Sequence, residues 1–329
     1  MGYYDRSISF LEGNELKNNK IKFDIRQFSL FIIVIVVALF LFIIKPEFRS
    51  SINIFGILYS ISVNSIIIGA MTVLYISGGF DMSVGSTLGL SGIVLGLLLV
   101  SGIPYIFAIL ITIFLGMSIG AITGYIISYL DANPFIVTLA GWFVIGALIF
   151  IVGKGTSISG IPKSFSLIAT YKIFNIPMII IFSTFSIIIF VVLLRTNVFF
   201  RQSYYIGGNE KAAMLVGIKV KKVKLFFYIL TSTMASIASI FLTARFSAAY
   251  NNAGYDSAFQ IITAVLIGGA SLKGGKGSVV GSFLGLILVA LVYDAIVLFN
   301  VNINWYKVVI GLTLVIAVLL NSVIQKENK

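Results

Sequence analysis

The hydrophobic residues of this chain gather in long runs that short polar segments separate. Most runs approach the about 20 residues that a helix needs to cross a bilayer. The pattern predicts ten membrane-crossing helices, at 28–44, 54–76, 84–101, 105–128, 135–152, 177–194, 225–244, 258–272, 278–299 and 305–321. The shorter runs are marginal for a full crossing, so we expect some of these helices to be tilted, broken or only partly crossing.

The composition supports an all-α polytopic membrane protein. The 329 residues are 59% hydrophobic and 10% charged, which is more apolar surface than a soluble fold of this length can bury. The chain has no Cys and no His, which excludes disulfides, thiol nucleophiles, imidazole bases and ordinary zinc sites. We therefore expect no catalytic residue, no metal site and no cofactor, and a protein that is not an enzyme.

The net charge of +12 fits a membrane protein without any nucleic acid partner, because Lys and Arg accumulate in cytoplasmic loops. Five basic residues fall in 1–27, seven in 195–224, and two each in 273–276 and 326–329, against seven assigned to the outer side. This bias predicts that both ends are cytoplasmic. The predicted parts are a cytoplasmic tail (1–27), a transmembrane domain (28–322) and a second cytoplasmic tail (323–329).

The stretch 195–224 is the longest polar interruption between hydrophobic runs after the N-terminal tail. Within it, Ala212, Leu215 and Val216 are spaced i, i+3 and i+4, which predicts a short helix with one small apolar face. Gly217 is placed to end that helix. From the residues alone, a docking helix and an ordinary basic loop are equally good interpretations.

Two glycine-rich breaks interrupt the hydrophobic pattern, and a similar sequence restarts each following run, SVGSTLGL at 83–90 and SVVGSFLGL at 278–286. Either break is a tight turn between two helices, the simpler interpretation, or a helix interruption whose backbone lines a polar path. The candidate residues are Gly78, Gly79, Asp81, Ser83 and Gly85 in the first break and Gly268 and Gly269 in the second. Asp81 is placed to cap the following helix.

The second break is not a phosphate-binding loop, since Ala270 and Gly277 stand where that motif needs Gly and Ser or Thr. Any ATPase must therefore be another subunit. Three ionisable residues near or within the hydrophobic runs are expected to be buried: Asp81, Asp131 and Asp294. We expect Asp294, the most deeply placed, to pair with a neighbouring helix; the alternative is a role in proton coupling. The segment 153–176 is predicted to be the largest outer loop, either a connector or a docking surface.

Four motifs together resemble the permease subunits of bacterial ABC importers for ribose and related sugars. They are GGFDMSVGS (78–86), NPFIVTLAG (133–141), GGNEKAAMLVGIKVKKVK (207–224) and IGGASLKGGKGSVVGSFLG (267–285). The same branch includes autoinducer-2, nucleoside and branched-chain amino acid permeases. The resemblance extends from about residue 52 to 321.

This resemblance implies a multi-pass protein of the bacterial cytoplasmic membrane that imports a ribose-like monosaccharide. Its expected partners are a second permease, identical or related, a cytoplasmic ATP-binding subunit, an extracytoplasmic sugar-binding protein and membrane lipid. The motif at 207–224 resembles the segment that docks on the ATPase, and the coupling residues it implies are Gly208, Asn209, Glu210, Ala212, Ala213, Leu215 and Gly217. Two alternatives remain: an ion-coupled secondary transporter, and the same class of importer with a nucleoside or autoinducer-2 substrate.

Overall fold

The computed structural model describes residues 25–327, and these are almost entirely helical. The helices are α2 (Ile25–Ile44), the 3-10 helix η2 (Pro46–Arg49), α3 (Ser51–Ile76), α4 (Val84–Val100), α5 (Tyr105–Tyr129), α6 (Pro134–Val152), α7 (Lys163–Thr170), α8 (Met178–Thr196), α9 (Val198–Gly208), α10 (Glu210–Leu215), α11 (Val220–Phe246), α12 (Ser257–Ile267), α13 (Val279–Leu298) and α14 (Asn304–Glu327). Each predicted hydrophobic run coincides with one of them. In the described part, seven are long and apolar enough to cross a membrane: α2, α3, α5, α6, α8, α11 and α13.

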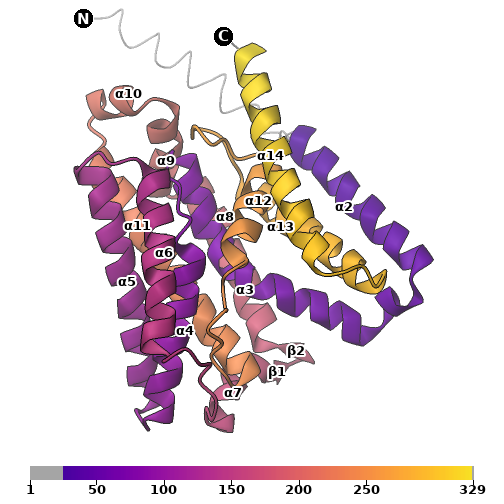
Figure 1. The fold of residues 1–329 in the computed structure, drawn as a ribbon. Coiled ribbons are helices and arrows are strands. Elements are labelled where there is room, and N and C mark those ends of the chain that lie inside the picture. The colour runs from indigo at the N-terminus through magenta and orange to yellow at the C-terminus, as the bar shows by residue number, and fades with distance from the viewer. Residues whose placement is uncertain (1–24, 328–329) are drawn as a thin grey trace, which may run out of the picture.

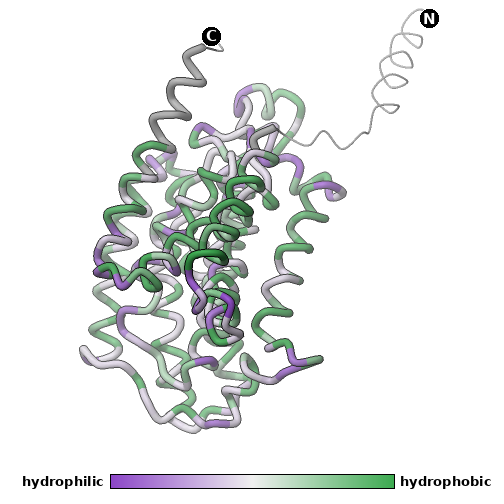
Figure 2. The backbone as a smooth tube through the Cα atoms, turned by 90° about the vertical axis from the view of Figure 1, so that its right-hand side faces the viewer, coloured by the Kyte–Doolittle hydropathy of each residue, from purple (hydrophilic) through white to green (hydrophobic). Residues whose placement is uncertain are grey.

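The long helices stand side by side in a bundle with two distinct ends (Figure 1). One end carries α9, α10 and the C-terminal end of α14, and we call it the α10 end. The other carries α7 and a small hairpin of β1 (Lys172–Ile173) and β2 (Ile176–Pro177), and we call it the α7 end. Figure 2 shows hydrophobic residues along the length of the outer helices, the surface expected of helices that face lipid.

The second half of α3 forms the centre of the core. Every residue from Ile61 to Ile76 is buried, and α8, α11, α12 and α13 pack against α3. In contrast, α2 leaves large side chains such as Phe28, Val36 and Phe40 exposed. A water-soluble protein would bury this apolar surface, so its exposure supports a membrane environment.

Small residues bring α5 and α11 into close contact. Gly116, Gly120 and Gly124 recur every fourth residue along one face of α5. A Cβ atom at Gly116 would lie 1.9 Å from the Ser236 Oγ, and one at Gly120 would lie 2.7 Å from the Tyr228 carbonyl oxygen. Such spacing lets helix backbones approach closely in membranes, where packing rather than the hydrophobic effect drives association.

The connections differ from the sequence prediction in three places. The 153–176 segment, expected to be the largest outer loop, contains α7 and the β1–β2 hairpin, whose turn at Phe174 and Asn175 has φ angles of 51° and 63°. The helix α14 continues to Glu327, into the predicted tail 323–329. The helix α2 begins at Ile25, and the remainder of the predicted N-terminal tail, with residues 328–329, lies outside the described residues.

Candidate functional site

Two asparagines set the start of α9 and of α10. The Asn197 Oδ1 accepts hydrogen bonds from the backbone N–H groups of Phe199 and Phe200, at 2.9 and 3.4 Å. The Asn209 Oδ1 likewise accepts from the backbone N–H of Ala212 at 3.0 Å. Asparagine is a preferred helix N-cap because it satisfies these free amides. The polar stretch therefore folds as two short capped helices rather than as an open loop.

The end of α10 turns the chain back toward the bundle. Gly217 has a φ angle of +87°, and its N–H donates to the Met214 carbonyl while that of Ile218 donates to Ala213. This left-handed ending favours glycine. Ala213 is buried against the bundle, which fixes the orientation of α10.

The opposite face of α10 is apolar and exposed. The predicted face of Ala212, Leu215 and Val216 points away from the bundle, and Leu215 is 89% exposed. Met214 extends the same surface. Glu210, in contrast, forms an ion pair with Lys224 of α11, so its carboxylate serves to hold α10 against the body of the protein.

A junction of closely packed glycines connects α9 to both helix breaks. A Cβ atom at Gly207 would lie 1.9 Å from the Ile76 carbonyl oxygen and 2.3 Å from the Gly275 backbone nitrogen. The Gly275 N–H donates to the Ile76 carbonyl at 2.8 Å. On the other side, a Cβ at Gly274 would lie 2.7 Å from the Gly78 nitrogen. We call Gly78, Gly207, Gly274 and Gly275 the glycine junction.

Tyr204 adds a side-chain contact to the same junction. Its hydroxyl donates to the Gly277 carbonyl oxygen at 3.0 Å. Burial raises the pKa of Tyr204, which keeps the hydroxyl protonated as a donor at physiological pH. The end of α3, the 268–278 segment and α9 therefore meet at one place, although they are far apart in the sequence.

The first break places a buried carboxylate at the start of α4. The Asp81 Oδ1 accepts from the backbone N–H and the hydroxyl of Ser83, at 2.8 and 2.6 Å. Asp81 is fully buried, and its Oδ2 has no hydrogen-bond partner among the described residues. Gly85 is in backbone contact, since a Cβ there would lie 2.3 Å from the Gly254 carbonyl oxygen. Gly79 is less constrained, because its Cβ would mainly meet the flexible Leu74 side chain.

The second break joins α12 to α13 through a close backbone contact. Gly269 ends α12 with a φ angle of +94°. A Cβ at Gly268 would lie 2.4 Å from the Gly281 carbonyl carbon, and one at Gly285 would lie 2.2 Å from the Ala264 carbonyl oxygen. The two contacts, Gly268 with Gly281 and Ala264 with Gly285, are four residues apart along both α12 and α13. The two backbones therefore touch along one full turn.

The remaining aspartates take different places. Asp294 is buried on α13 and accepts a hydrogen bond from the Asn53 Nδ2 of α3 at 3.0 Å. The expectation that Asp131 is buried is wrong, because it lies mostly exposed in the α5–α6 turn, where it forms an ion pair with Lys221 at 3.3 Å. Neither lies beside Asp81 in a chain of acidic groups.

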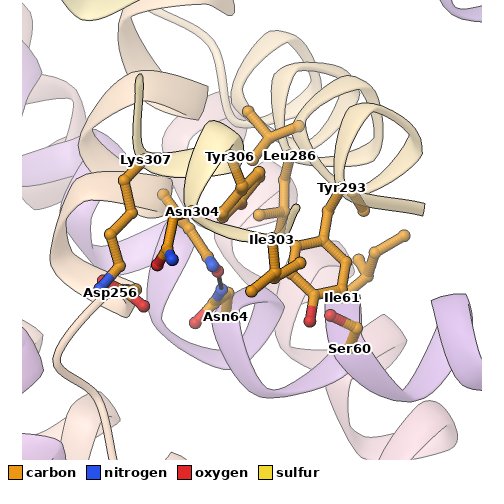
Figure 3. A pocket seen from close by; sticks show the side chains of 13 residues that line it. Ser60, Ile61, Asn64, Asp256, Leu286, Tyr293, Ile303, Asn304, Tyr306 and Lys307 are labelled. Atoms are coloured by element: carbon orange, nitrogen blue, oxygen red, sulfur yellow. Dashed lines mark hydrogen bonds between the residues drawn. The ribbon is translucent and has the colours of Figure 1, made fainter. Parts of the chain in front are cut away.

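The cavities between helices of the described residues include three that contain few of the residues predicted from the sequence. One, of about 410 Å³, borders the first break and is walled by Phe80, Phe135 and Phe259. A second, of about 360 Å³, lies beside Trp142 and Tyr255. The third, of about 400 Å³, is polar and lies between α3, α12, α13 and α14 (Figure 3). These polar positions carry no short motif, so only the packing of distant helices identifies them.

Comparison with known proteins supports the resemblance found from the motifs. A family model described as the permease component of branched-chain amino acid transport systems matches residues 53–318. The chain is 35% identical to the "Ribose import permease protein RbsC" of Bacillus subtilis, over 89% of this chain and 90% of that protein. The corresponding protein of Haemophilus influenzae is 31% identical over 93% and 96%.

The similarity extends to a permease for a different substrate. The "Autoinducer 2 import system permease protein LsrD" of Salmonella paratyphi B is 32% identical over 77% of this chain and 78% of that protein. No solved structure matches. The predicted resemblance is thus confirmed: this chain belongs to the family of ABC importer permease components that includes the ribose import permeases.

Proposed function

We propose that this chain is the translocating subunit of an ATP-driven importer that brings a ribose-like monosaccharide into a bacterial cell. The observation that carries the proposal is the exposed apolar face of α10, held by its own caps and connected through the glycine junction to both helix breaks. A face of this kind needs a partner surface. In this proposal the partner is a cytoplasmic ATPase, and this chain itself hydrolyses nothing and needs no cofactor.

The proposed topology has ten crossings, with both ends of the chain and the α10 end in the cytoplasm. Lys219, Lys221 and Lys222 follow α10 directly in the chain, and Lys273 adjoins Gly274 of the glycine junction. Basic residues of short loops orient membrane proteins in this way. The α7 end then faces the exterior, where the β1–β2 hairpin is available to a sugar-binding protein.

The coupling mechanism follows from the contacts at the junction. Movement of the ATPase would displace α10 and, through Asn209, α9. At Gly207 there is no side chain to absorb that displacement, so it acts directly on Ile76 and Gly275. The ends of α3 and α12 would then shift together. Two copies of such a permease, identical or related, would open alternately outward and inward as their ATPases bind and hydrolyse ATP.

The proposed substrate class rests on relatives over nearly the full length of the chain. Two of those described are named for ribose import, and one for autoinducer 2. All three names describe import, which favours uptake over export. A ribose-like monosaccharide is therefore the substrate we propose, with autoinducer 2 as the second candidate.

Transport by reconstituted protein tests the proposal. The permease would be placed in liposomes with its ATPase and sugar-binding protein. The uptake of radiolabelled D-ribose would be measured with and without ATP on the side of the membrane where the ATPase lies. We expect uptake that depends on ATP and on both partners. Uptake by the permease alone, driven by a proton or sodium gradient, would instead establish a secondary transporter.

A further inference from the structure

The polar cavity between α3, α12, α13 and α14 is complete within one chain (Figure 3). Its volume is about 400 Å³, and small-molecule sites commonly have volumes of about 300–1,000 Å³. Figure 3 shows Asn64 beneath Tyr306 and Asn304, with Asp256 and Lys307 to one side. Elements that are distant in the sequence thus supply polar groups to one partly open cavity.

An amide pair from two helices forms the floor of this cavity. The Asn64 Nδ2 of α3 donates to the Gln260 Oε1 of α12 at 2.6 Å. Asn64 is only 5% exposed, and its Oδ1 has no hydrogen-bond partner among the described residues. This bond fixes both amide groups against each other, and the Asn64 Oδ1 lies buried behind the floor rather than open to the cavity. The floor is therefore a rigid polar surface that joins α3 to α12.

Aromatic rings and opposite charges complete the lining. Tyr293 and Tyr306 meet edge to face, with ring centroids 4.8 Å apart, and both line the cavity. Asp256 and Lys307 also line it, so it offers one anion and one cation rather than a net charge. This combination suits a neutral ligand that has several hydroxyl groups and an apolar C–H face. A metal cation would need more carboxylates, and an acyl chain would find too few apolar walls.

The cavity is also connected to the junction at the α10 end. Asp256 and Gln260 stand at the start of α12, and the other end of that helix is held by Gly268 against α13. Any displacement of the second break therefore moves α12 and with it two groups of the cavity. A ligand bound here would be held or released as the junction moves.

We propose that this cavity is a monosaccharide-binding site within each permease chain, with the Asn64–Gln260 pair holding its polar floor in place. The inference rests on the proposed sugar transport, but the site is formed by one chain and can be measured without ATPase or binding protein. It adds to the proposed coupling a place where the sugar pauses inside the permease.

Cysteine protection tests the site directly, because the chain has no Cys. Ser60→Cys introduces a thiol on the exposed rim of the cavity, and Ser51→Cys introduces one on the same helix outside it. In purified permease, we expect D-ribose at about 100 mM to slow thiol labelling of Ser60→Cys several-fold and to leave Ser51→Cys unchanged. Glycine betaine, which has no hydroxyl groups, should protect neither variant. Equal labelling of Ser60→Cys with and without D-ribose would overturn the proposal.

Substitution of the amide pair gives an independent measurement. Asn64→Leu and Gln260→Leu should each abolish the D-ribose protection of Ser60→Cys and reduce D-ribose uptake by the full complex at least about tenfold. Ser62→Ala, on the same helix but outside the cavity lining, should preserve both. Protection that survives both leucine substitutions would exclude these residues. If the wild-type complex transports no D-ribose, the proposed function fails, and the protection assay still reports separately on the cavity.

Discussion

The glycine junction predicts that one methyl group at Gly207 uncouples the transporter. Gly207→Ala would place a Cβ atom 1.9 Å from the Ile76 carbonyl oxygen. Ordinary contacts lie at about 3.5 Å, so the two backbones must separate by roughly 1.5 Å. That shift breaks the hydrogen bond from Gly275 to Ile76, now 2.8 Å long. Overpacking costs about 1–3 kcal/mol and the lost hydrogen bond about 1 kcal/mol, enough to detach α9 from both breaks.

The assay compares ATP turnover with sugar uptake in the reconstituted complex. Because the α10 surface is unchanged in Gly207→Ala, we expect the ATPase to remain bound and its basal turnover to persist. Uptake of D-ribose, and the stimulation of turnover by sugar-loaded binding protein, should fall at least about tenfold. The variant should therefore hydrolyse ATP without moving sugar.

The neighbouring residue provides a matched control. A Cβ atom at Gly208 would meet no other atom of the described chain within 4 Å. The resemblance includes Gly208 in the coupling segment, but because a methyl group there meets nothing in the described chain, Gly208→Ala should keep uptake within about twofold of the wild type. Full coupling in Gly207→Ala, or an equal loss in Gly208→Ala, would refute the idea that backbone contact at the junction transmits the motion.

Three further predictions concern the α7 end and the buried acid. Ser159→Cys, on the exposed 153–176 segment, should react with an impermeant thiol reagent in intact cells; reaction only in broken cells would invert the proposed topology. Phe174, 95% exposed at the hairpin tip, should contact the binding protein. Phe174→Asp should therefore raise about tenfold the concentration of sugar-loaded binding protein that gives half-maximal ATPase stimulation. An unchanged concentration would show that the hairpin is not part of the docking surface. Asp294→Ala should lower the free energy of unfolding of the permease by about 1–3 kcal/mol, because it leaves Asn53 unpaired. Asp294→Asn should retain ATP-driven uptake. A loss of proton-dependent uptake in Asp294→Asn would instead make Asp294 a proton carrier.

The helices could be predicted from the sequence because lipid imposes a simple rule on it. A crossing helix must be apolar along about 20 residues, and this signal is strong for α2, α5 and α6. The positions of the two breaks were also predictable, since paired glycines interrupt the pattern. The short face of α10 was predictable because its spacing and Gly217 are local features.

The contacts between distant segments were not predictable in the same way. Gly207 belongs to a motif interpreted only as part of the coupling segment, yet its main contacts are Ile76 and Gly275. Asn64 and Gln260 are each the one amide residue in a predicted hydrophobic run, and nothing local indicates that they face each other. The spacing of Gly116, Gly120 and Gly124 is a local signal of close helix packing, and it could have predicted the contact between α5 and α11.

The most direct test of the central claim is whether the exposed face of α10 holds the ATPase. Leu215→Asp places a carboxylate where an apolar side chain would enter the ATPase surface, without disturbing the fold, because Leu215 is 89% exposed. Losing such an interface residue costs about 2 kcal/mol or more, roughly 30-fold in the dissociation constant. Leu167→Asp makes the same change on an exposed residue of α7. Measured as ATPase retained on the detergent-purified permease, Leu215→Asp should lose its partner and Leu167→Asp should keep it. Retention of the ATPase by Leu215→Asp, with sugar-stimulated turnover intact, would show that the exposed face of α10 does not hold the ATPase.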